Sequence, residues 1–582
     1  MDFLKDSKLK KVELTLSFVL SGVLLFFIGQ NINSFLFSSL WCDELYTVLH
    51  FTSKGALNAV TDYHVPNNHI FFSLINSIIP GYDSVEPARA RMFSFISLLA
   101  FIFFAYSYFY NLKQYLLAPV FLFFLYSNSL LLDLVLQARG YGLLSFFILV
   151  SCICVYKYFR DGGRLNLLLL CISCVLAVYT IPTSVVFYFF LWVLLLTFAE
   201  KRKGVFISAA ISGFVVALVH IPVLGQLLEV SSTYADGWGR QFGSLSAIKE
   251  TIFKFSFLKS YLDVFIVLVC CVVASFSKSS TFSKPALTLF FSVLLSLLVF
   301  RLLETPIPRT VAFVLIVLFF VALHAINKLS LFPKLRLFSL LLIFAFSFIH
   351  SIYSIRAYQY TPYENWKGVA SFIEQNVPEG TEVYCPFRSI LLKAYLPESY
   401  PIVTEPNDSL ISIGKQTVVD GDFLSKDGLG VNLSNSYPIA VPQIRGDKQV
   451  IYLPENYLSE PLNKVKVGSI DSIRILQNRY EGVSYDISCD GNFILQFYSS
   501  SETSIKGHKH VLFYDEKGEL LLYKNIDNFF KYVFWSEHHS ELDPSKVHKV
   551  VFRVKGSAPL EGMIIVDSCF IYKAPNRTSN GF

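Results

Sequence analysis

The stretch Trp41-Cys42-Asp43-Glu44-Leu45-Tyr46-Thr47 places two adjacent carboxylates shortly after the first long apolar run, Val12 to Ile28. A charged side chain at the centre of a bilayer costs roughly 2.5–3.5 kcal/mol on insertion scales. We therefore expect Asp43 and Glu44 to lie at or just outside the membrane interface, or to face a polar cavity. A purely structural interpretation is equally open, because Trp and Tyr favour the headgroup level and acidic residues are common near helix ends.

The composition around this stretch is that of a membrane protein. Of 582 residues, 53% are hydrophobic and only 16% are charged, with 57 Phe and 32 Tyr, and the mean hydropathy is +0.51. Soluble domains carry about 25% charged residues. The apolar runs stop near residue 356, which predicts a polytopic α-helical membrane protein with a C-terminal soluble region. The net charge of +6 does not indicate a nucleic-acid partner, because much of the surplus lies in short loops between apolar runs.

The apolar runs predict the number of membrane spans. A transmembrane helix needs about 20 predominantly apolar residues, and by that measure we expect about eleven such helices. They are predicted at residues 12–30, 88–110, 116–132, 137–156, 165–181, 184–199, 205–225, 260–276, 286–303, 310–326 and 337–356.

Positive charges in the short loops predict the orientation, because cytoplasmic loops are enriched in Lys and Arg. With eleven spans, the N-terminal lysines and the basic loop residues all fall on one side, which is then cytoplasmic. The first loop, the loop at 226–259 and everything after about residue 356 lie on the other side. We expect an integral protein of the cytoplasmic (inner) membrane with an extracytoplasmic site. The loop residues are Lys113, Lys157, Arg160, Arg164, Lys201, Arg202, Lys203, Lys278, Lys284, Lys328, Lys334 and Arg336.

The first extracytoplasmic loop, residues 31–87, is long and only partly polar. Its segment from Asn68 to Ile79 is apolar but too short to span a membrane. Such a run indicates a helix that lies in the interface or dips into it. The same loop carries a group of polar side chains, namely Asp62, His64, Asn67, Asn68 and His69.

Two basic residues stand where an anionic ligand could be held. Asp133, Gln137 and Tyr141 have i, i+4, i+8 spacing and would share one face of an unbroken helix. Arg139 would then point elsewhere, which favours a helix that begins later than Asp133. The second basic residue, Arg309, lies between the ninth and tenth spans. Both arginines are candidate functional residues, and the alternative is that they are anchors that reach the headgroups.

These pieces resemble, in their order along residues 10–400, the GT-C fold glycosyltransferases that use polyprenyl-phosphate sugars. The group that they resemble is the protein O-mannosyltransferase and aminoarabinose-transferase-like superfamily. One departure is that Ile70 stands where the family pattern has proline. The matching segments are Trp41-Cys-Asp43-Glu44, Asn68-His69-Ile70-Phe71-Phe72, Gln137-Ala-Arg139-Gly-Tyr141, Pro308-Arg309 and Asn365-Trp-Lys-Gly-Val-Ala-Ser-Phe-Ile.

The resemblance implies transfer of a sugar from a polyprenyl-phosphate donor to an acceptor hydroxyl of a glycan, lipid or protein, with inversion. Asp43 is then the general base that takes the acceptor proton. Glu44 orients Asp43, binds the acceptor, or joins Asp43 around a divalent cation. Cationic donors stabilise the leaving phosphate, and the candidates are His69, Arg139 and Arg309. The candidates for substrate binding are Asn68, Asp133, Gln137 and Tyr141.

The region after the membrane part is predicted to contain two domains. Residues 357–460 begin with a helix-like stretch, Glu364 to Asn376, and continue with short apolar strands, which indicates a small α/β domain. Residues 461–582 contain short alternating runs separated by turn residues, which predicts a β-sandwich. Such sandwiches often bind carbohydrate, but that is an analogy of fold alone. A lid or spacer is the alternative.

Two other function classes compete with a glycosyltransferase. A phospho-group transferase needs a metal-bound Ser or Thr nucleophile in a large soluble domain, and the sequence shows no such pattern. A lipid-linked glycan transporter is disfavoured by the paired carboxylates outside the membrane, by the large external region and by the lack of recognisable inverted repeats. The sequence specifies neither the sugar nor the acceptor.

Overall fold

The computed structural model of the chain divides into two compact units. The helical unit comprises Met1–Glu364 together with Ile444–Gly446, and the C-terminal unit comprises Asn365–Gln443 and Asp447–Phe582. The structure describes residues 2–81, 84–126, 129–234, 280–302, 312–327, 336–345, 348, 366–385, 389–404, 416–420, 436–441, 449–454, 464–468, 471–475, 481–487, 493–501, 507–525, 531–535, 542–556 and 562–573.

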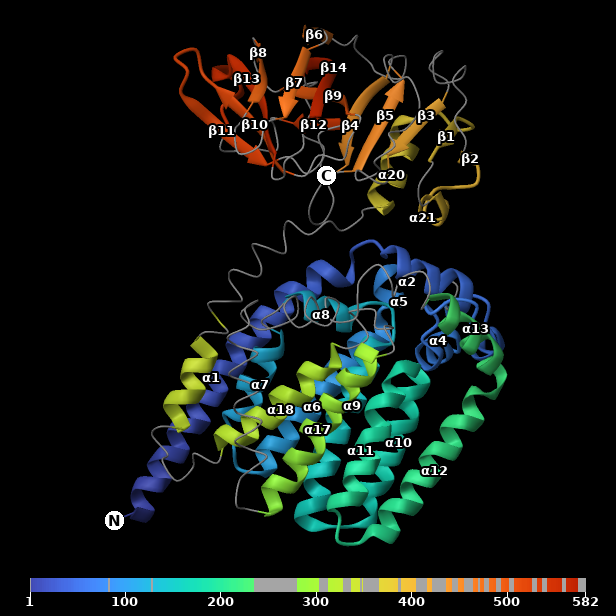
Figure 1. Cartoon of the computed structure of the whole chain (residues 1–582), viewed down its shortest axis with the longest axis vertical. Helices are drawn as coiled ribbons and strands as arrows, with labels where there is room; N and C mark the ends of the chain where they lie inside the picture. Colours follow the sequence, from blue (N-terminus) through green and yellow to red (C-terminus); the bar gives the residue numbers. More distant parts are fainter. Residues whose placement is uncertain are drawn as a thin grey trace. The chain divides into compact units, whose positions relative to one another are not determined.

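The helical unit is a bundle of apolar helices (Figure 1). Five described segments are long and apolar enough to cross a membrane, namely Lys10–Gly29, Met92–Asn111, Tyr141–Asp161, Arg202–Val230 and Ser283–Phe300. The prediction of a polytopic α-helical membrane protein is confirmed. The main helices are α1 (Asp2–Leu36), α6 (Met92–Asn111), α7 (Leu117–Tyr126), α9 (Tyr141–Asp161), α10 (Arg164–Thr180), α11 (Val185–Phe198), α12 (Arg202–His220), α13 (Leu224–Tyr234), α17 (Ser280–Leu302), α18 (Phe313–Asn327) and Arg336–Ala345.

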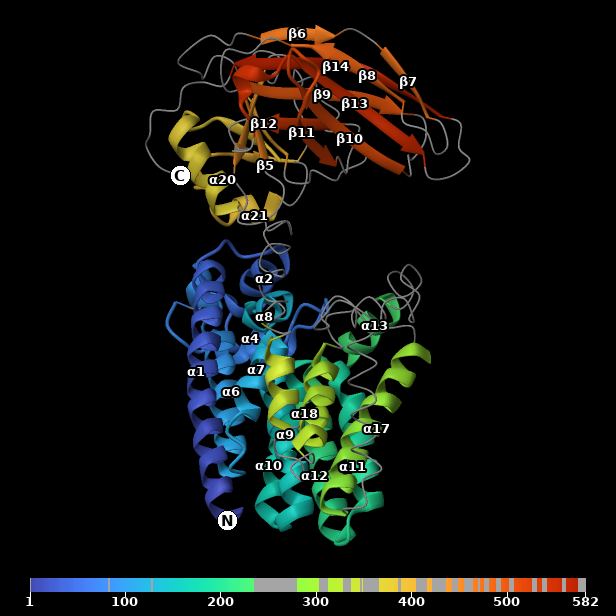
Figure 2. The ribbon, with the colours of Figure 1, turned by 90° about the vertical axis from the view of Figure 1, so that its left-hand side faces the viewer.

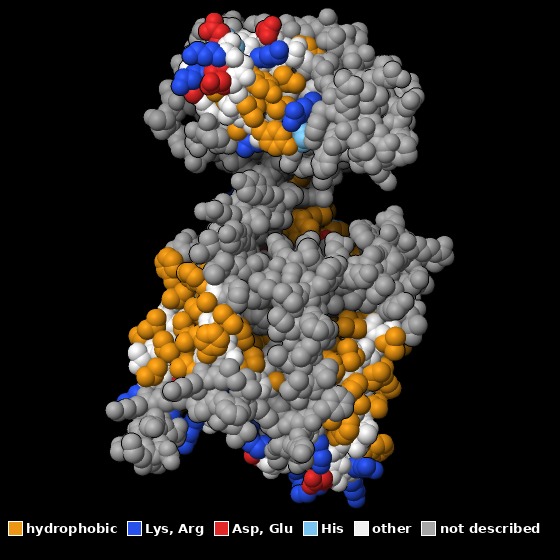
Figure 3. Space-filling view, turned by 60° about the vertical axis from the view of Figure 1, so that its left-hand side comes forward, with side chains coloured by type: hydrophobic (Ala, Val, Ile, Leu, Met, Phe, Trp, Pro, Cys, Tyr) orange, Lys and Arg blue, Asp and Glu red, His pale blue; other side chains and the backbone are white. Residues whose placement is uncertain are grey.

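Large apolar side chains are exposed on the described parts of the bundle face that Figure 3 shows. Phe18, Phe26, Phe103 and Phe214 are examples of rings that are exposed on the membrane helices. A soluble protein rarely exposes so large an apolar surface, whereas in a bilayer the lipid chains cover it. The exposed rings therefore agree with helices that lie in a membrane.

Basic residues gather at the end of the bundle where the N-terminus lies (Figures 1 and 3). Two ion pairs tie helices together there. Lys284 of α17 lies 3.2 Å from Glu200, and Arg336 pairs with Glu13 of α1. The predicted clustering of these loop charges at one end is therefore found for the residues that the structure describes.

The predicted span at 116–132 is wrong, because the chain divides there into two short helices. These are α7 and α8 (Ser129–Leu136). Eight residues of helix rise only about 12 Å, too little to cross a bilayer. The spans predicted at 260–276 and, beyond residue 345, at 337–356 lie outside the described residues, apart from position 348.

Asp133 and Tyr141 do not share an unbroken helix, in agreement with the later helix start inferred from Arg139. The helix α8 ends at Leu136, residues 137–140 form a turn, and α9 begins at Tyr141. The turn forms because two of its backbone N–H groups bond to side chains from the first loop instead of to helix carbonyls. The N–H of Ala138 donates to Glu44, and that of Gly140 donates to His69.

The first loop folds into short helices at the end of the bundle opposite the N-terminus (Figure 2). A helix is present, as predicted, within residues 68–79. Its C-terminal end is held by Arg89, whose Nη1 donates to Asn76 Oδ1 at 2.7 Å and whose Nη2 donates to the Asn76 carbonyl at 3.1 Å. The elements are α2 (Cys42–Thr47), a π-helical turn η1 (Val48–Thr52), α3 (Ala56–Thr61), α4 (Ile70–Ser77) and α5 (Pro87–Ala90).

The C-terminal unit begins with α20 (Trp366–Asn376) and a five-stranded mixed sheet. The sheet has the order β2-β1-β3-β5-β4, with β1 parallel to both its neighbours and β5 antiparallel to both of its own. The helix buries Trp366, Val369, Phe372 and Ile373. The elements are α21 (Ser389–Lys393), β1 (Glu382–Tyr384), β2 (Ile402–Val403), β3 (Gln416–Asp420), β4 (Ser436–Val441) and β5 (Gln449–Pro454).

The rest of the C-terminal unit consists of two antiparallel sheets, in line with the β-rich region predicted for residues 461–582. One has the order β11-β10-β13-β8, and the other has the order β12-β9-β14-β6, with β7 also paired to β14. The strands are β6 (Lys464–Gly468), β7 (Asp471–Ile475), β8 (Glu481–Asp486), β9 (Phe493–Ser501), β10 (Gly507–Tyr514), β11 (Leu520–Asn525), β12 (Lys531–Trp535), β13 (Lys549–Gly556) and β14 (Gly562–Lys573).

Candidate active site

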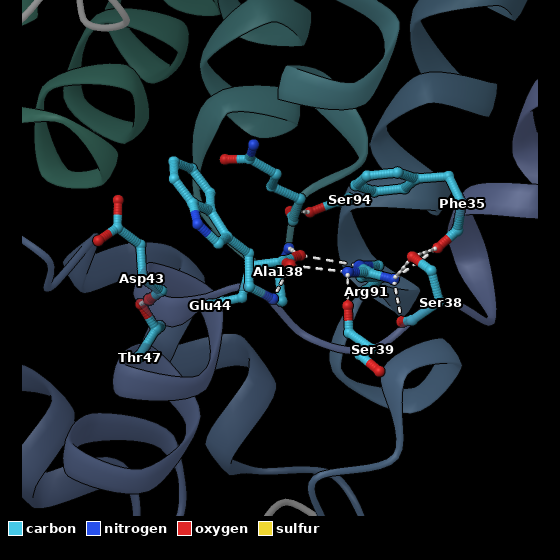
Figure 4. Close-up of polar contacts among 11 residues, drawn as sticks. Phe35, Ser38, Ser39, Asp43, Glu44, Thr47, Arg91, Ser94 and Ala138 are labelled. Carbon is cyan, nitrogen blue, oxygen red and sulfur yellow. Dashed lines mark hydrogen bonds and ion pairs between the residues drawn. The ribbon is translucent and has the colours of Figure 1, made fainter. Parts of the chain in front are cut away.

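A fully buried ion pair joins Glu44 of α2 to Arg91, which precedes α6 (Figure 4). Both side chains have 0% exposure. The contact is bidentate, because Arg91 Nε donates to Glu44 Oε1 at 2.8 Å and Nη2 donates to Oε2 at 2.6 Å. Bidentate geometry makes an arginine–carboxylate pair both strong and directional. The pair therefore fixes the position of α2 against the start of α6.

The remaining donors of Arg91 bind the end of α1. Nη1 donates to the carbonyls of Phe35 and Ser38 at 2.5 and 2.8 Å, and Nη2 donates to the carbonyl of Ser39 at 3.1 Å. The guanidinium also lies over the ring of Phe35, 4.2 Å from its centroid, a favourable cation–π contact. One arginine thus satisfies the carbonyls where the first span gives way to the loop.

Glu44 in turn satisfies two backbone N–H groups. Its Oε2 accepts from the N–H of Trp41 at 2.9 Å, and its Oε1 accepts from the N–H of Ala138 at 2.6 Å. Both carboxylate oxygens are therefore occupied by protein donors. The second of these bonds brings the 137–140 turn next to α2, although the two are almost a hundred residues apart in sequence.

Asp43 points away from this buried pair (Figure 4). Its Oδ2 lies 2.9 Å from Arg139 Nη1, with 22% of the Asp43 side chain and 4% of the Arg139 side chain exposed. Its Oδ1 lies 3.4 Å from the amide nitrogen of Asn67, and the oxygen of the same amide accepts from Arg139 Nη2 at 3.2 Å. Of the two adjacent acids, only Asp43 is partly open to a ligand.

The protonation state of His69 follows from one contact. The backbone N–H of Gly140 donates to His69 Nδ1 at 2.6 Å. A backbone N–H cannot accept a hydrogen bond, so Nδ1 carries no hydrogen, and the ring hydrogen lies on Nε2. His69 is then a neutral donor and not the cation expected from the sequence.

The close approach of His69 requires glycine at position 140. A Cβ on Gly140 would overlap the methyl group of Thr180 and would lie 3.0 Å from both Cβ and Nδ1 of His69. A residue larger than glycine therefore does not fit here unless Thr180 of α10 or His69 moves. Because residue 140 is glycine, the turn can bring both Arg139 and the N–H of residue 140 next to the His69 ring.

The guanidinium of Arg139 and the ring of His69 point N–H groups toward one another. Their Nη2 and Nε2 atoms lie 3.4 Å apart, and with the hydrogen on Nε2 neither nitrogen can accept from the other. Within the described part of the chain, the buried Nε of Arg139 has no hydrogen-bond acceptor. The ring of Tyr141 packs beside both groups, with its centroid 4.9 Å from that of the His69 ring and 5.1 Å from the Arg139 guanidinium carbon. Donors thus converge beside Asp43.

Three other predicted residues lie around this point. Asn68 is buried and uses its amide nitrogen within the loop, donating to the carbonyls of Ala59 and Asp62 at 2.9 and 2.6 Å. Gln137 is buried in the turn, and its backbone carbonyl accepts from Ser94. Asp133 is buried in α8. Arg309 lies outside the described residues.

The arrangement does not fit a metal ion shared by Asp43 and Glu44. Both oxygens of Glu44 are used by Arg91 and by backbone N–H groups, and the two carboxylates point in different directions (Figure 4). Among the described residues, no group of three or more His, Cys, Asp and Glu side chains is placed to hold a metal ion.

Two residues that the sequence did not single out belong to the site. Arg91 stands at the start of an apolar helix, and that position alone was a signal, because a charge there needs a partner. Asn67 bridges Asp43 and Arg139, but in the sequence nothing distinguishes it from its neighbour Asn68. Only the path of the loop shows which amide faces the site.

We predict that Glu44→Gln strongly destabilises the protein. The substitution leaves Arg91 charged and buried without a counter-ion, and breaking a buried pair in this way costs about 3–5 kcal/mol. The measurement is the thermal unfolding midpoint in detergent. The matched control is Asp161→Asn, which breaks an exposed pair with Arg160 and should change stability by about 1 kcal/mol or less. Equal effects of the two substitutions would contradict the role of the buried pair.

We predict that Asp133→Asn leaves stability unchanged or raises it at neutral pH. Burial raises the pKa of Asp133 well above its ordinary value of 3.8, and the nearby charge of Glu44 adds to this, whereas Arg91 opposes it. A raised folded-state pKa means that the wild type loses stability as the pH rises from about 3.8 through the folded-state pKa. The advantage of Asn should therefore grow with pH over that range. Unfolding midpoints recorded from pH 4 to pH 8 test this, and a constant gap would contradict it.

The comparisons with known proteins concern the fold. No family model matches the sequence, and no curated protein matches it. Similar solved structures include ArnT from Cupriavidus metallidurans bound to undecaprenyl phosphate, with 11% identity, a TM-score of 0.45, and coverage of 76% of this chain and 98% of ArnT. The mycobacterial arabinofuranosyltransferase AftD has 10% identity and a TM-score of 0.39, with 96% of this chain and 61% of AftD covered.

The arabinosyltransferase EmbB from Mycobacterium smegmatis has 10% identity and a TM-score of 0.31, with 94% of this chain and 64% of EmbB covered. ArnT is an aminoarabinose transferase, and all three are GT-C fold glycosyltransferases.

Proposed function

We propose that this chain is a membrane glycosyltransferase that moves a sugar from a polyprenyl-phosphate carrier to an acceptor hydroxyl. The observation that supports this best is the convergence of donors from Arg139 and His69 beside the carboxylate of Asp43. Nε of Arg139 is buried without an acceptor among the described residues, so an anionic ligand could bond to it. A carboxylate next to these donors supplies a base. Together these are the two groups that a sugar phosphate donor and a hydroxyl acceptor require.

A phosphate suits the donor side of this site. Arginine binds phosphate through two parallel N–H groups, and Nε of Arg139 is buried without an acceptor among the described residues. The neutral His69 adds a hydrogen bond from Nε2 without adding a charge. The phosphate of a lipid carrier lies at the membrane surface, and the site lies on short helices at one end of the apolar bundle (Figure 2).

The proposed reaction is a direct displacement. The acceptor oxygen forms a bond to the anomeric carbon, and the bond from that carbon to the phosphate oxygen breaks. The acceptor proton goes to Asp43, and the electron pair of the broken bond leaves with the phosphate. Arg139 and His69 stabilise the charge that grows on the phosphate. Attack from the face opposite the leaving group inverts the anomeric centre.

The ion pair between Asp43 and Arg139 couples the two halves of the reaction. While Arg139 holds Asp43 Oδ2, its positive charge opposes the uptake of a proton by that carboxylate. A bound phosphate competes for the same guanidinium. Donor binding should therefore weaken the pair and leave Asp43 a better base, so that base and donor become ready together.

The site is placed on the extracytoplasmic side in this proposal. The basic loop residues gather at the opposite end of the bundle, and such residues mark the cytoplasmic side. Polyprenyl-phosphate sugar, membrane lipid and an acceptor are then the partners of the chain. The first loop would hold both substrates at the outer surface of the cytoplasmic membrane.

The proposal predicts opposite effects for two substitutions. Asp43→Asn should lower sugar transfer by roughly 10²–10⁴-fold, the usual contribution of a general base, while undecaprenyl phosphate binds as tightly or more tightly. Arg139→Lys should weaken that binding, because lysine cannot form the two parallel bonds. Binding is measured with undecaprenyl phosphate and purified protein in nanodiscs. Transfer is measured as release of the lipid phosphate from a panel of synthetic polyprenyl-phosphate sugars.

The control is Arg89→Lys, a substitution in the same region whose donors hold the end of α4 and not the site. It should leave lipid phosphate binding within about twofold of the wild type. If Arg139→Lys binds the lipid phosphate as well as Arg89→Lys does, the anion site is wrong. Near-normal transfer by Asp43→Asn would remove Asp43 from the chemistry.

A further inference from the structure

A second polar cluster lies on the first loop, next to the site but not part of it. We call it the outer cluster, and it consists of Tyr46, His50, Asp62 and His64. Asp62 Oδ1 lies 2.5 Å from His64 Nδ1, and His64 Nε2 lies 2.8 Å from the hydroxyl of Tyr46. The ring of His50 stacks on that of Tyr46 with centroids 4.1 Å apart. Side chains from α2, η1 and the α3–α4 loop are thus linked.

Asp62 fixes one hydrogen-bond direction within the outer cluster. A carboxylate accepts only, so Nδ1 of His64 donates to it, and Nε2 of the same ring shares a hydrogen bond with the hydroxyl of Tyr46. A phenol oxygen both donates and accepts, which suits the Tyr46 hydroxyl to bond to a ligand as well. An acid, an imidazole and a hydroxyl in this order form an oriented chain.

The cluster lies along the same helix as the proposed base. Tyr46 follows Asp43 by three residues on α2, and side chains at this spacing lie on one face of a helix. The 137–140 turn contacts the first part of α2 through Glu44. The outer cluster contacts its last turn and the π-helical turn that follows. A ligand beside Tyr46 is therefore within reach of Asp43.

The outer cluster is held in place but open. On its far side, Gln226 of α13 accepts from the N–H of Tyr63, and its amide nitrogen donates to the carbonyl of Thr61 at 3.3 Å. These bonds fix the segment that carries Asp62 and His64. The side chains of His64 and Asp62 are nevertheless 42% and 24% exposed. A fixed and exposed polar group is suited to meet a ligand.

The charges of the outer cluster disfavour an anionic ligand. Asp62 and Asp43 both carry carboxylates, and the guanidinium of Arg139 is paired with Asp43. Burial, with Lys54 and His64 adding to it, lowers the pKa of His50, so its ring is neutral at pH 7. Of the described side chains, His50 Nε2 is one of the buried atoms that have no hydrogen-bond partner. Rings with a few fixed polar atoms are typical of sites for neutral ligands.

We infer that the outer cluster is the subsite for the acceptor, and that the acceptor is a neutral sugar residue. A hydroxyl of this sugar donates to the Tyr46 oxygen, and another donates to Asp62, while a neighbouring hydroxyl is presented to Asp43. The attacking oxygen then forms the new bond to the anomeric carbon, and its proton goes to Asp43. This inference rests on the proposed function and adds the class of acceptor.

Binding of simple sugars tests the inference without knowledge of the natural acceptor. The probes are methyl α-glucoside, methyl α-galactoside, methyl α-mannoside and methyl β-glucuronide, and the readout is saturation-transfer NMR on the full chain in nanodiscs. At least one neutral glycoside should bind, and more tightly than the glucuronide. Tyr46→Phe and Asp62→Asn should each weaken its binding about three- to tenfold, the usual effect of losing one hydrogen bond.

Two controls keep failure of the inference distinct from failure of the proposed function. Thr61→Ala, which removes an exposed hydroxyl bonded only within α3, should bind both ligands like the wild type. Undecaprenyl phosphate binding should stay within about twofold in Tyr46→Phe and Asp62→Asn, which also shows that they are folded. The inference is overturned if no neutral glycoside binds, if the glucuronide binds best, or if these variants bind the glycoside like Thr61→Ala. Absence of lipid phosphate binding in the wild type would instead count against the proposed function.

Discussion

The buried ion pair between Glu44 and Arg91 is the contact on which the arrangement of the site depends. It joins the end of α1, the short helix α2, the start of α6 and the turn before α9 through one carboxylate and one guanidinium. Burying two charges is costly, and a buried pair is often no better for stability than apolar residues of the same volume. Its benefit here is geometric, because the bidentate contact and the bonded carbonyls admit one arrangement. Asp43, the preceding residue, is thereby held at a fixed place in the site.

Adjacent acids in one short motif thus have different tasks. Glu44 is occupied on both oxygens by protein donors, whereas Asp43 is partly exposed and contacts Arg139 and Asn67. The sequence left three roles open for Glu44, and the structure favours that of orienting its neighbour. The same division is found in two other pairs of neighbours. Asn67 contacts Asp43 and Arg139, whereas Asn68 bonds within the loop. Arg139 contacts Asp43, whereas the N–H of Gly140 orients His69. In each case one residue faces the site and the next one holds the backbone path.

The sequence predicted the membrane helices, the β-rich end and the segments that meet at the site, because these depend on hydropathy and local pattern. The position of Arg139 favoured a helix that begins after Asp133, and α9 begins at Tyr141. The sequence did not predict what stabilises the 137–140 turn, since Glu44 and His69 bond to it from a distant loop. The neutral state of His69 was equally hidden, because it depends on one backbone N–H. Long-range partners decide such features, and no local pattern contains them.

In the proposed function, Arg139 and His69 together hold the phosphate of a lipid carrier. A structure of the full chain with undecaprenyl phosphate, determined by electron cryo-microscopy in nanodiscs, tests it most directly. We expect phosphate oxygens within about 3.2 Å of the Arg139 guanidinium and of His69 Nε2, with the contact between Arg139 and Asp43 lengthened. A phosphate bound elsewhere, with Arg139 Nη1 still at 2.9 Å from Asp43 Oδ2, would contradict it.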